Sequence, residues 1–163
     1  MVIIRILSLC RLKIWWIVNK ILLHSCCAPC SSGVIEELKE DYDITIIYYN
    51  PNIEPEEEYL KRKDNQLKLL SKLNIPHIDI DYLNNEFKDI IKGHEKEPEN
   101  GSRCHLCYKL RLEKAADLAS KEGFNYFGTT LSVSPHKNSE IINKIGKEIS
   151  NKFNIEPPTN LFL

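Results

Sequence analysis

The sequence predicts an α/β fold: a Rossmann-like parallel sheet with helices on both faces. Two observations predict it. Short apolar or β-branched runs, typical of buried strands, alternate along the chain with longer segments in which apolar residues recur at helical spacing. In addition, cysteine and polar groups follow two of the predicted strands, at residues 26–30 and 129–137, and in such folds ligands gather at the carboxyl ends of the strands.

The predicted elements follow in order along the chain. Four strands are expected at residues 21–23, 44–49, 77–81 and 125–131. Helices are expected at residues 31–39, 56–73, 87–91, 104–121 and 139–153. Ser31 or Ser32 is expected to cap the first of these helices.

Length and composition indicate one domain with a real core. The chain has 163 residues, of which 42% are hydrophobic, and this apolar content argues against disorder. We expect the domain to span residues 20–163, preceded by an unrelated extension at residues 1–19. The formal net charge of −1 gives no global attraction to nucleic acid, but it leaves room for a local basic patch.

The N-terminal extension is apolar without being a membrane span. Arg5, Arg11 and Lys13 interrupt it, so no uncharged stretch reaches the roughly 20 residues that a spanning helix needs. No small-residue cleavage site follows it, as a secretory signal would require. A misplaced start or an amphipathic surface helix are the two alternatives, and Cys10 is expected to be a bystander. We therefore expect no membrane partner, and the clustered cysteines described next favour a cytoplasmic protein.

Five of the six cysteines form two tight groups. Cys26, Cys27 and Cys30 follow the first strand, and Cys104 and Cys107 open the long fourth helix. Such groups are typical of metal or redox chemistry rather than of a disulfide framework. Helix starts also offer free backbone N–H groups and a positive dipole end, which favour thiolates and anionic clusters. The sequence therefore predicts one metal site built from both groups.

Spacing alone leaves three alternatives open. The cysteines hold an iron–sulfur cluster, or they hold a structural zinc, or Cys27 and Cys30 form a thioredoxin-like dithiol. The adjacency of Cys26 and Cys27 weighs against zinc, whose paired ligands are usually two to four residues apart. The dithiol alternative leaves Cys26, Cys104 and Cys107 without a purpose.

A series of motifs resembles the cobalamin-independent epoxyqueuosine reductases. The resemblance runs from about residue 21 to about residue 153 and keeps the order and spacing of the motifs. The matching segments are residues 22–32 (LLHSCCAPCSS), 49–53 (YNPNI), 101–108 (GSRCHLCY), 110–112 (LRL) and 129–137 (TTLSVSPHK).

The resemblance implies a fold, an activity and a cofactor. The fold is of the HUP or PP-loop-like kind, and the activity is reduction of epoxyqueuosine to queuosine in tRNA, the last step of queuosine biosynthesis. Cys26, Cys27, Cys104 and Cys107 are expected to hold a [4Fe–4S] cluster, with Cys30 close to it but not assigned as a ligand. Removal of the epoxide oxygen requires two electrons and protons, and such a cluster transfers electrons one at a time. The partners are tRNA and an electron donor that the sequence does not identify.

The end of the chain departs from that family. Family members continue further and end with a second cysteine pair, Cys-x-Cys, whereas this chain stops at Leu163. We expect an incomplete C-terminus with its last strand missing, which would leave a sheet edge exposed. The alternatives to an active reductase are therefore an inactive metal-binding remnant and a thiol–disulfide oxidoreductase that uses Cys27 and Cys30.

Four residues are candidates for contact with substrate. Lys137, next to His136, follows a strand end and would meet a tRNA phosphate, unless it is a solvated cation. Arg103 would bind phosphate or form an ion pair. Tyr108 would stack on the modified base, unless it is a core tyrosine. The catalytic residues are not identified by the sequence.

Two further residues near the cysteines are also of interest. His24 is expected either to donate a proton or a hydrogen bond to the metal site, or to be a satisfied histidine at a strand end. Arg111 is expected to pair with an acidic side chain of the preceding loop, namely Glu95, Glu97 or Glu99.

Overall fold

The computed structural model describes residues 19–158. Residues 1–18 and 159–163 lie outside the described part, and with them Cys10 and almost all of the predicted N-terminal extension. Within the described part, no helix is both long and apolar enough to cross a bilayer.

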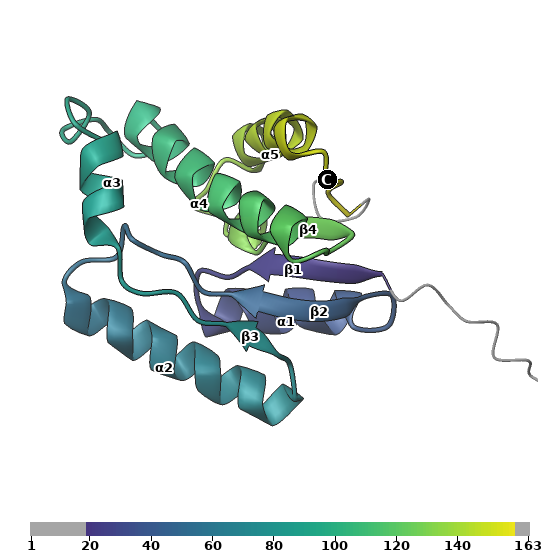
Figure 1. Cartoon of the computed structure of the whole chain (residues 1–163). Coiled ribbons are helices and arrows are strands. Elements are labelled where there is room, and N and C mark those ends of the chain that lie inside the picture. The colour runs from purple at the N-terminus through teal and green to yellow at the C-terminus, as the bar shows by residue number, and fades with distance from the viewer. Residues whose placement is uncertain (1–18, 159–163) are drawn as a thin grey trace, which may run out of the picture.

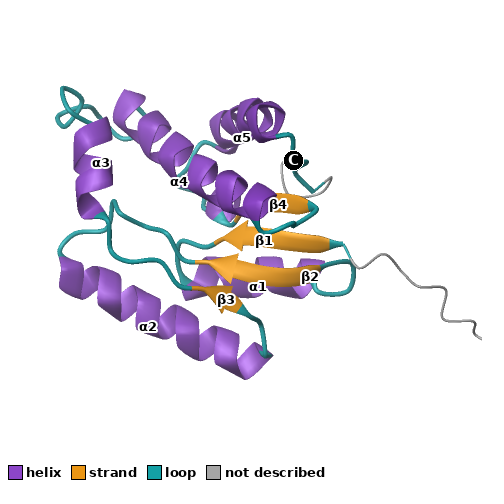
Figure 2. Cartoon of the chain, in the orientation of Figure 1, coloured by secondary structure: helices purple, strands orange, loops and turns teal. Residues whose placement is uncertain are grey.

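A sheet of four parallel strands forms the centre of the fold, in the order β3-β2-β1-β4 (Figure 2). Helices return the chain between strands, so all four carboxyl ends lie along one edge of the sheet. The predicted α/β fold with a parallel sheet is confirmed. The strands are β1 (Lys20–His24), β2 (Asp43–Ile47), β3 (His77–Ile78) and β4 (Tyr126–Thr129).

Helices cover both faces of this sheet (Figure 1). Helices α1 and α2 lie on one side, and α4 and α5 lie on the other, with α3 beside the start of α4. A short 3-10 helix, η1, follows β4. Their bounds are α1 (Ala28–Leu38), α2 (Glu56–Leu73), α3 (Asn84–Ile90), α4 (Ser102–Lys121), η1 (Leu131–Val133) and α5 (Ser139–Phe153).

The alternation of side chains along the strands divides the core into two parts. Ile21 and Leu23 of β1 pack with the inner faces of α1 and α2, together with Ile44 of β2. Leu22 points the other way and packs with α4, α5 and Phe127 of β4. Because successive side chains of a strand point to opposite faces, each apolar run is buried on both sides. This explains the continuous ILL run in β1.

Several element bounds differ from the prediction. Helix α1 begins at Ala28 rather than at residue 31, because Pro29 has the backbone angle that suits a first helical turn. Ser31, predicted as the cap, lies inside the helix and donates from Oγ to the carbonyl of Cys27 at 2.8 Å. The third strand is only two residues long, because it pairs with β2 alone and the chain leaves the sheet after Ile78.

The outer edge of β4 makes a further contact with the end of the described part of the chain. Glu156 forms an isolated parallel bridge with Tyr126, and the carbonyl of Glu156 accepts the N–H of Phe127 at 3.2 Å. Within residues 19–158, no full fifth strand follows this bridge.

Candidate metal centre

The first cysteine group forms a compact cluster of sulfur atoms. Cys26 and Cys27 lie between β1 and α1, and Cys30 lies in the first turn of α1. The three Sγ atoms all lie within 4.8 Å of one another, and Sγ of Cys26 is 3.8 Å from Sγ of Cys27. Cys26 is buried, and the other two are half-buried. Within the described residues, this is the one group of three possible metal ligands at such distances.

The second cysteine group lies in the first turns of α4. Cys104 is half-buried and packs against the hydrophobic cluster that contains Cys26, and Cys107 is buried with its Sγ 3.9 Å from Nη1 of Arg111. The fold therefore brings the two groups, 77 positions apart in sequence, to the same face of the sheet. The close group of three contains Cys30, however, and neither Cys104 nor Cys107. The predicted ligand set of Cys26, Cys27, Cys104 and Cys107 stays a prediction.

The protonation of the first group is uneven. Burial opposes the thiolate of Cys26, but Arg111 and a hydrogen bond with Thr130 outweigh it, so the pKa of Cys26 lies below its ordinary value. Burial raises the pKa of Cys30 to about 12, with the adjacent sulfurs of Cys26 and Cys27 adding to the effect. The thiolate is the form of cysteine that binds metals. Of Cys26 and Cys30, Cys26 is therefore the one that loses its proton more readily and is better suited to bind a metal.

His24 is fully buried, and both of its ring nitrogens are occupied. Thr129 Oγ1 accepts the N–H of Leu131 at 3.1 Å, so its own hydrogen is available to His24 Nδ1, which lies 3.0 Å away. His24 Nδ1 is therefore the acceptor, and Nε2 carries the proton and donates to the carbonyl of Tyr49 at 2.9 Å. Burial, followed by the charge of Arg111, holds the pKa of His24 well below 6.5. Of the two sequence alternatives, the structure favours the satisfied, neutral histidine.

The environment of Arg111 differs from the prediction. Its side chain is buried, and Nη2 donates to Oδ1 of Asn50 at 2.5 Å, while Nη1 lies 3.9 Å from Sγ of Cys107. The expected ion pair with an acidic residue of the preceding loop is wrong, because the helix directs Arg111 inward, away from that loop. Asn50 was missed by the sequence analysis, although it lies in one of the motifs.

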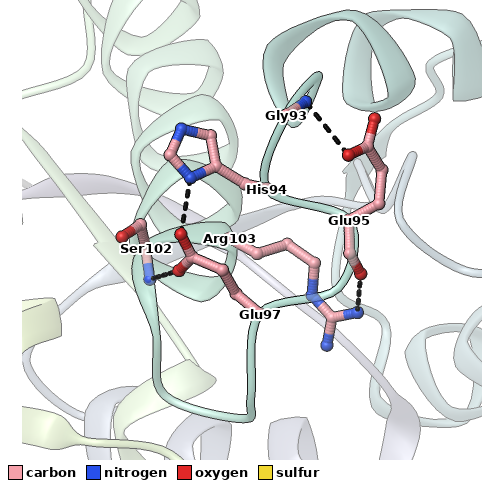
Figure 3. A network of polar contacts seen from close by, with 6 residues as sticks. All are labelled: Gly93, His94, Glu95, Glu97, Ser102 and Arg103. Carbon is pink, nitrogen blue, oxygen red and sulfur yellow. Dashed lines mark hydrogen bonds and ion pairs between the residues drawn. The ribbon is translucent and has the colours of Figure 1, made fainter.

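The loop before α4 has its own polar network (Figure 3). The carboxylate of Glu97 accepts Nδ1–H of His94 at 2.7 Å and the backbone N–H of Ser102 at 2.5 Å. These two donors lower the pKa of Glu97 to about 2. The carboxylate of Glu97 thus accepts one of the free N–H groups at the start of α4. That N–H belongs to Ser102, which lies two residues before Cys104. This contact was also missed, because sequence spacing showed only a charged loop.

The four substrate candidates occupy different positions. Lys137 is half-buried, and its charge contributes to the lowered pKa values of both His24 and Cys26, so it lies near the cysteines. His136 is exposed. Arg103 is half-buried and donates from Nη1 to the carbonyl of Glu95 at 3.4 Å, as Figure 3 shows. Tyr108 is 4% exposed and packs in the core, so its ring is not on the surface in this structure.

Comparison with solved structures supports the fold. A crystal structure described as a predicted subunit of tRNA methyltransferase, from Methanocaldococcus jannaschii, aligns over 88% of this chain and 68% of its own length with a TM-score of 0.60. The two sequences are only 15% identical, so this likeness concerns the fold alone.

Comparison with known sequences identifies the family. A family model described as "Epoxyqueuosine reductase QueH" matches residues 21–162. A protein of that name from Haemophilus influenzae is 46% identical over 136 residues, which are 83% of this chain and 56% of the relative. Its counterpart in Acinetobacter baylyi is 47% identical over 129 residues, 78% of this chain and 59% of the relative.

The chain spans somewhat more than half the length of these relatives. A more divergent relative, from Thermotoga maritima, is 33% identical, and the alignment covers 83% of this chain and 71% of that protein. The match of nearly the whole domain to the family model is consistent with each of these alignments. The chain belongs to the epoxyqueuosine reductase QueH family.

Proposed function

We propose that this protein reduces epoxyqueuosine in tRNA to queuosine at a [4Fe–4S] cluster held by Cys26, Cys27, Cys104 and Cys107. One observation carries the proposal: Cys104 packs against the hydrophobic cluster that contains Cys26, and Cys107 lies beside the buried Arg111, which has no carboxylate partner among residues 19–158. A site with several thiols and a fixed positive charge suits an anionic metal–thiolate group. A tRNA substrate supports a cytoplasmic location for the protein.

The chemistry requires electrons that no side chain supplies. Loss of the epoxide oxygen as water leaves a carbon–carbon double bond and consumes two electrons and two protons. The cluster, when bound, would pass these electrons one at a time from an external donor. Cys26 and Cys107 are buried, and neutral His24, two residues before Cys26, holds the ends of β1 and β4 together.

Binding of tRNA is assigned to the edge of the sheet that carries the carboxyl ends. Lys137, near the cysteines, and Arg103, at the start of α4, would contact phosphates and so position the tRNA without reading its sequence. His136 lies exposed beside Lys137 and extends the same surface.

One observation favours a second candidate, a non-catalytic zinc-binding protein. Tetrahedral Zn²⁺ with Zn–S bonds of about 2.3 Å places two sulfurs about 3.8 Å apart. The separation of Cys26 Sγ and Cys27 Sγ is 3.8 Å. A thiol–disulfide oxidoreductase that uses Cys27 and Cys30 is the third candidate.

Metal analysis after anaerobic purification separates the candidates. We expect a coloured protein with iron and sulfide in equal amounts, about four of each per chain. Cys104→Ser should lose the cluster, and Cys10→Ser, a cysteine outside both groups, should keep it. A colourless protein with zinc alone would overturn the cluster, and thiol exchange that survives Cys104→Ser but not Cys30→Ser would support the dithiol.

Activity is then measured with the loaded protein. The substrate is tRNA that carries epoxyqueuosine, the reductant is dithionite, and the product is queuosine in the nucleoside digest. Formation of queuosine by the wild-type chain, and its absence in the Cys104→Ser variant, is the expected result. An iron-loaded chain that forms no queuosine would overturn the proposed activity, although the fold and the metal site would stand.

A further inference from the structure

Arg111 is the most unusual charged residue of the described chain. It lies on α4 one turn after Cys107, and it is only 3% exposed. A guanidinium group stays protonated in proteins, so this is a permanent positive charge in the core. Its surroundings decide whether that charge is compensated.

The partners of Arg111 include no carboxylate in the described structure. Nη2 donates to the side-chain amide of Asn50 at 2.5 Å, and Nη1 lies 3.9 Å from Sγ of Cys107. Nε lies 3.4 Å from Nε2 of His24, which is neutral and directs its own proton to Tyr49. Among residues 19–158, none of the ion pairs includes Arg111.

A buried charge without a counter-charge is costly, so the fold must supply a negative group in the functional protein. The groups near Arg111 that become anionic on binding a metal are the cysteines. Cys107 contacts the guanidinium directly. The guanidinium therefore lies against the second cysteine group.

Asn50 fixes the orientation of this charge. Its Nδ2 donates to the carbonyl of Ser25, next to Cys26, at 2.8 Å, and this leaves its Oδ1 directed at Arg111. The amide thus links the end of β2, the cysteine loop and α4. Because both atoms of the amide are used, a flipped amide would place donors against donors.

We propose that Arg111 is a positioning residue that lies against the metal–thiolate centre and raises its reduction potential, with Asn50 holding the guanidinium in place. This inference rests on the proposed function for the presence of a redox-active centre. When an external one-electron donor such as dithionite reduces the centre, no bond breaks and the centre gains one negative charge. A positive charge fixed in a buried, poorly screened position favours that reduced form.

The test measures potentials of the full chain loaded with iron and sulfide. The variants are Arg111→Gln, which removes the charge, and Arg111→Lys, which keeps the charge but lacks the planar group of several N–H donors that arginine has. Lys109→Gln is the matched control, because Lys109 is an exposed cation on the same helix, two residues from Cys107. Iron and sulfide are counted first, and the potential is then measured by redox titration followed by electron paramagnetic resonance.

We expect Arg111→Gln to shift the one-electron equilibrium toward the oxidised form by about tenfold, which is about 59 mV. Arg111→Lys should stay closer to wild type, and Lys109→Gln should not change the potential. If Arg111→Gln fails to hold the cluster, Asn50→Asp tests the inference in its place. This variant puts a carboxylate beside the guanidinium of Arg111, which stays in the protein. The negative charge should lower the reduction potential. Unchanged potentials in the loaded Arg111 and Asn50 variants would overturn this inference alone.

The outcome for the wild-type chain separates the two proposals. A wild-type chain that binds only zinc has no reduction potential to tune and would overturn both. A wild-type chain with the cluster, together with an Arg111→Gln variant of equal iron content and equal potential, leaves the proposed function standing without the role of Arg111.

Discussion

The hydroxyl of Thr129 donates to Nδ1 of His24 over 3.0 Å and so joins the carboxyl ends of β4 and β1, two residues before Cys26. The same oxygen accepts the N–H of Leu131 at 3.1 Å, which starts the 3-10 helix after β4. One side chain thereby fixes the tautomer of a buried histidine and the turn that leads to Lys137. Both residues are fully buried, so neither contact is replaced by water when it is lost.

Replacement of Thr129 by Val should therefore destabilise the protein. The change keeps the shape of the side chain but leaves His24 Nδ1 and the N–H of Leu131 without partners. Loss of a buried partner costs about 1–3 kcal/mol, and we expect a decrease of that size in the free energy of unfolding, measured in urea. Thr45→Val is the control, because Thr45 is half-buried on β2 and no hydrogen bond involves its side chain in the described structure. Equal effects of the two changes would contradict the role given to Thr129.

The neutral state of His24 predicts a pH dependence of stability. An unfolded chain binds a proton at this residue as the pH falls through about 6.5, whereas burial and Arg111 keep the folded residue neutral to lower pH. Protonation therefore favours the unfolded chain. The stability that neutral His24 supplies is complete above about pH 6.5 and decreases below it, by up to about 1.4 kcal/mol per pH unit.

Urea unfolding of the metal-free protein at a series of pH values measures this decrease. His24→Gln cannot titrate, so the variant should lose this part of the pH dependence although it is less stable at neutral pH. His77→Gln, at an exposed position on β3, should leave the dependence unchanged. A decrease that is identical in wild type and His24→Gln would assign it to other groups.

The fold was largely predictable because its signals are local. The β-branched run in β2 and the helical spacing in α2 are patterns of neighbouring residues, and both elements lie where they were predicted. The third strand was overestimated for a tertiary reason. After Ile78 the chain turns toward α2, where Asp79 pairs with Lys63 and the carbonyl of Ile80 accepts the hydroxyl of Tyr59. The alternation of His77 to Asp81 carries no information about these partners.

The site was predictable only in its cysteines. Their spacing is visible in the sequence, and so is the separation of four residues that brings Arg111 onto the face of Cys107. The partner of Arg111 is 61 residues away, at the end of another strand, and no spacing rule connects the two. Proximity along the chain favours the acidic residues of the loop before α4 instead, and for this reason the predicted partner of Arg111 was wrong.

The start of α4 depends on Glu97. Its carboxylate accepts the N–H of Ser102 and Nδ1–H of His94, and Glu97→Gln should weaken both contacts. We expect faster amide exchange in the first turn of α4, and weaker retention of metal by Cys104, measured by hydrogen exchange and by competition with a chelator. Glu99→Gln, an exposed change in the same loop, is the control and should alter neither. Equal exchange in both variants would show that the loop does not hold the helix start.

Two glycines, Gly101 in the same loop and Gly33 on α1, should respond to alanine in opposite ways. A Cβ added at Gly101 would lie 2.9 Å from Oε2 of Glu97 and 3.0 Å from the carbonyl oxygen of Pro98. Because the second of these atoms is backbone, the loop itself must move, and we expect Gly101→Ala to destabilise the protein by about 1–3 kcal/mol. At Gly33, on α1, an added Cβ meets nothing within 4 Å, so Gly33→Ala should stabilise the protein by about 0.5–1 kcal/mol through its better helix propensity. Urea unfolding of the two variants measures both changes. A Gly101→Ala protein as stable as wild type would mean that the loop before α4 adapts freely, and the position of Cys104 would then have to be fixed from within the helix.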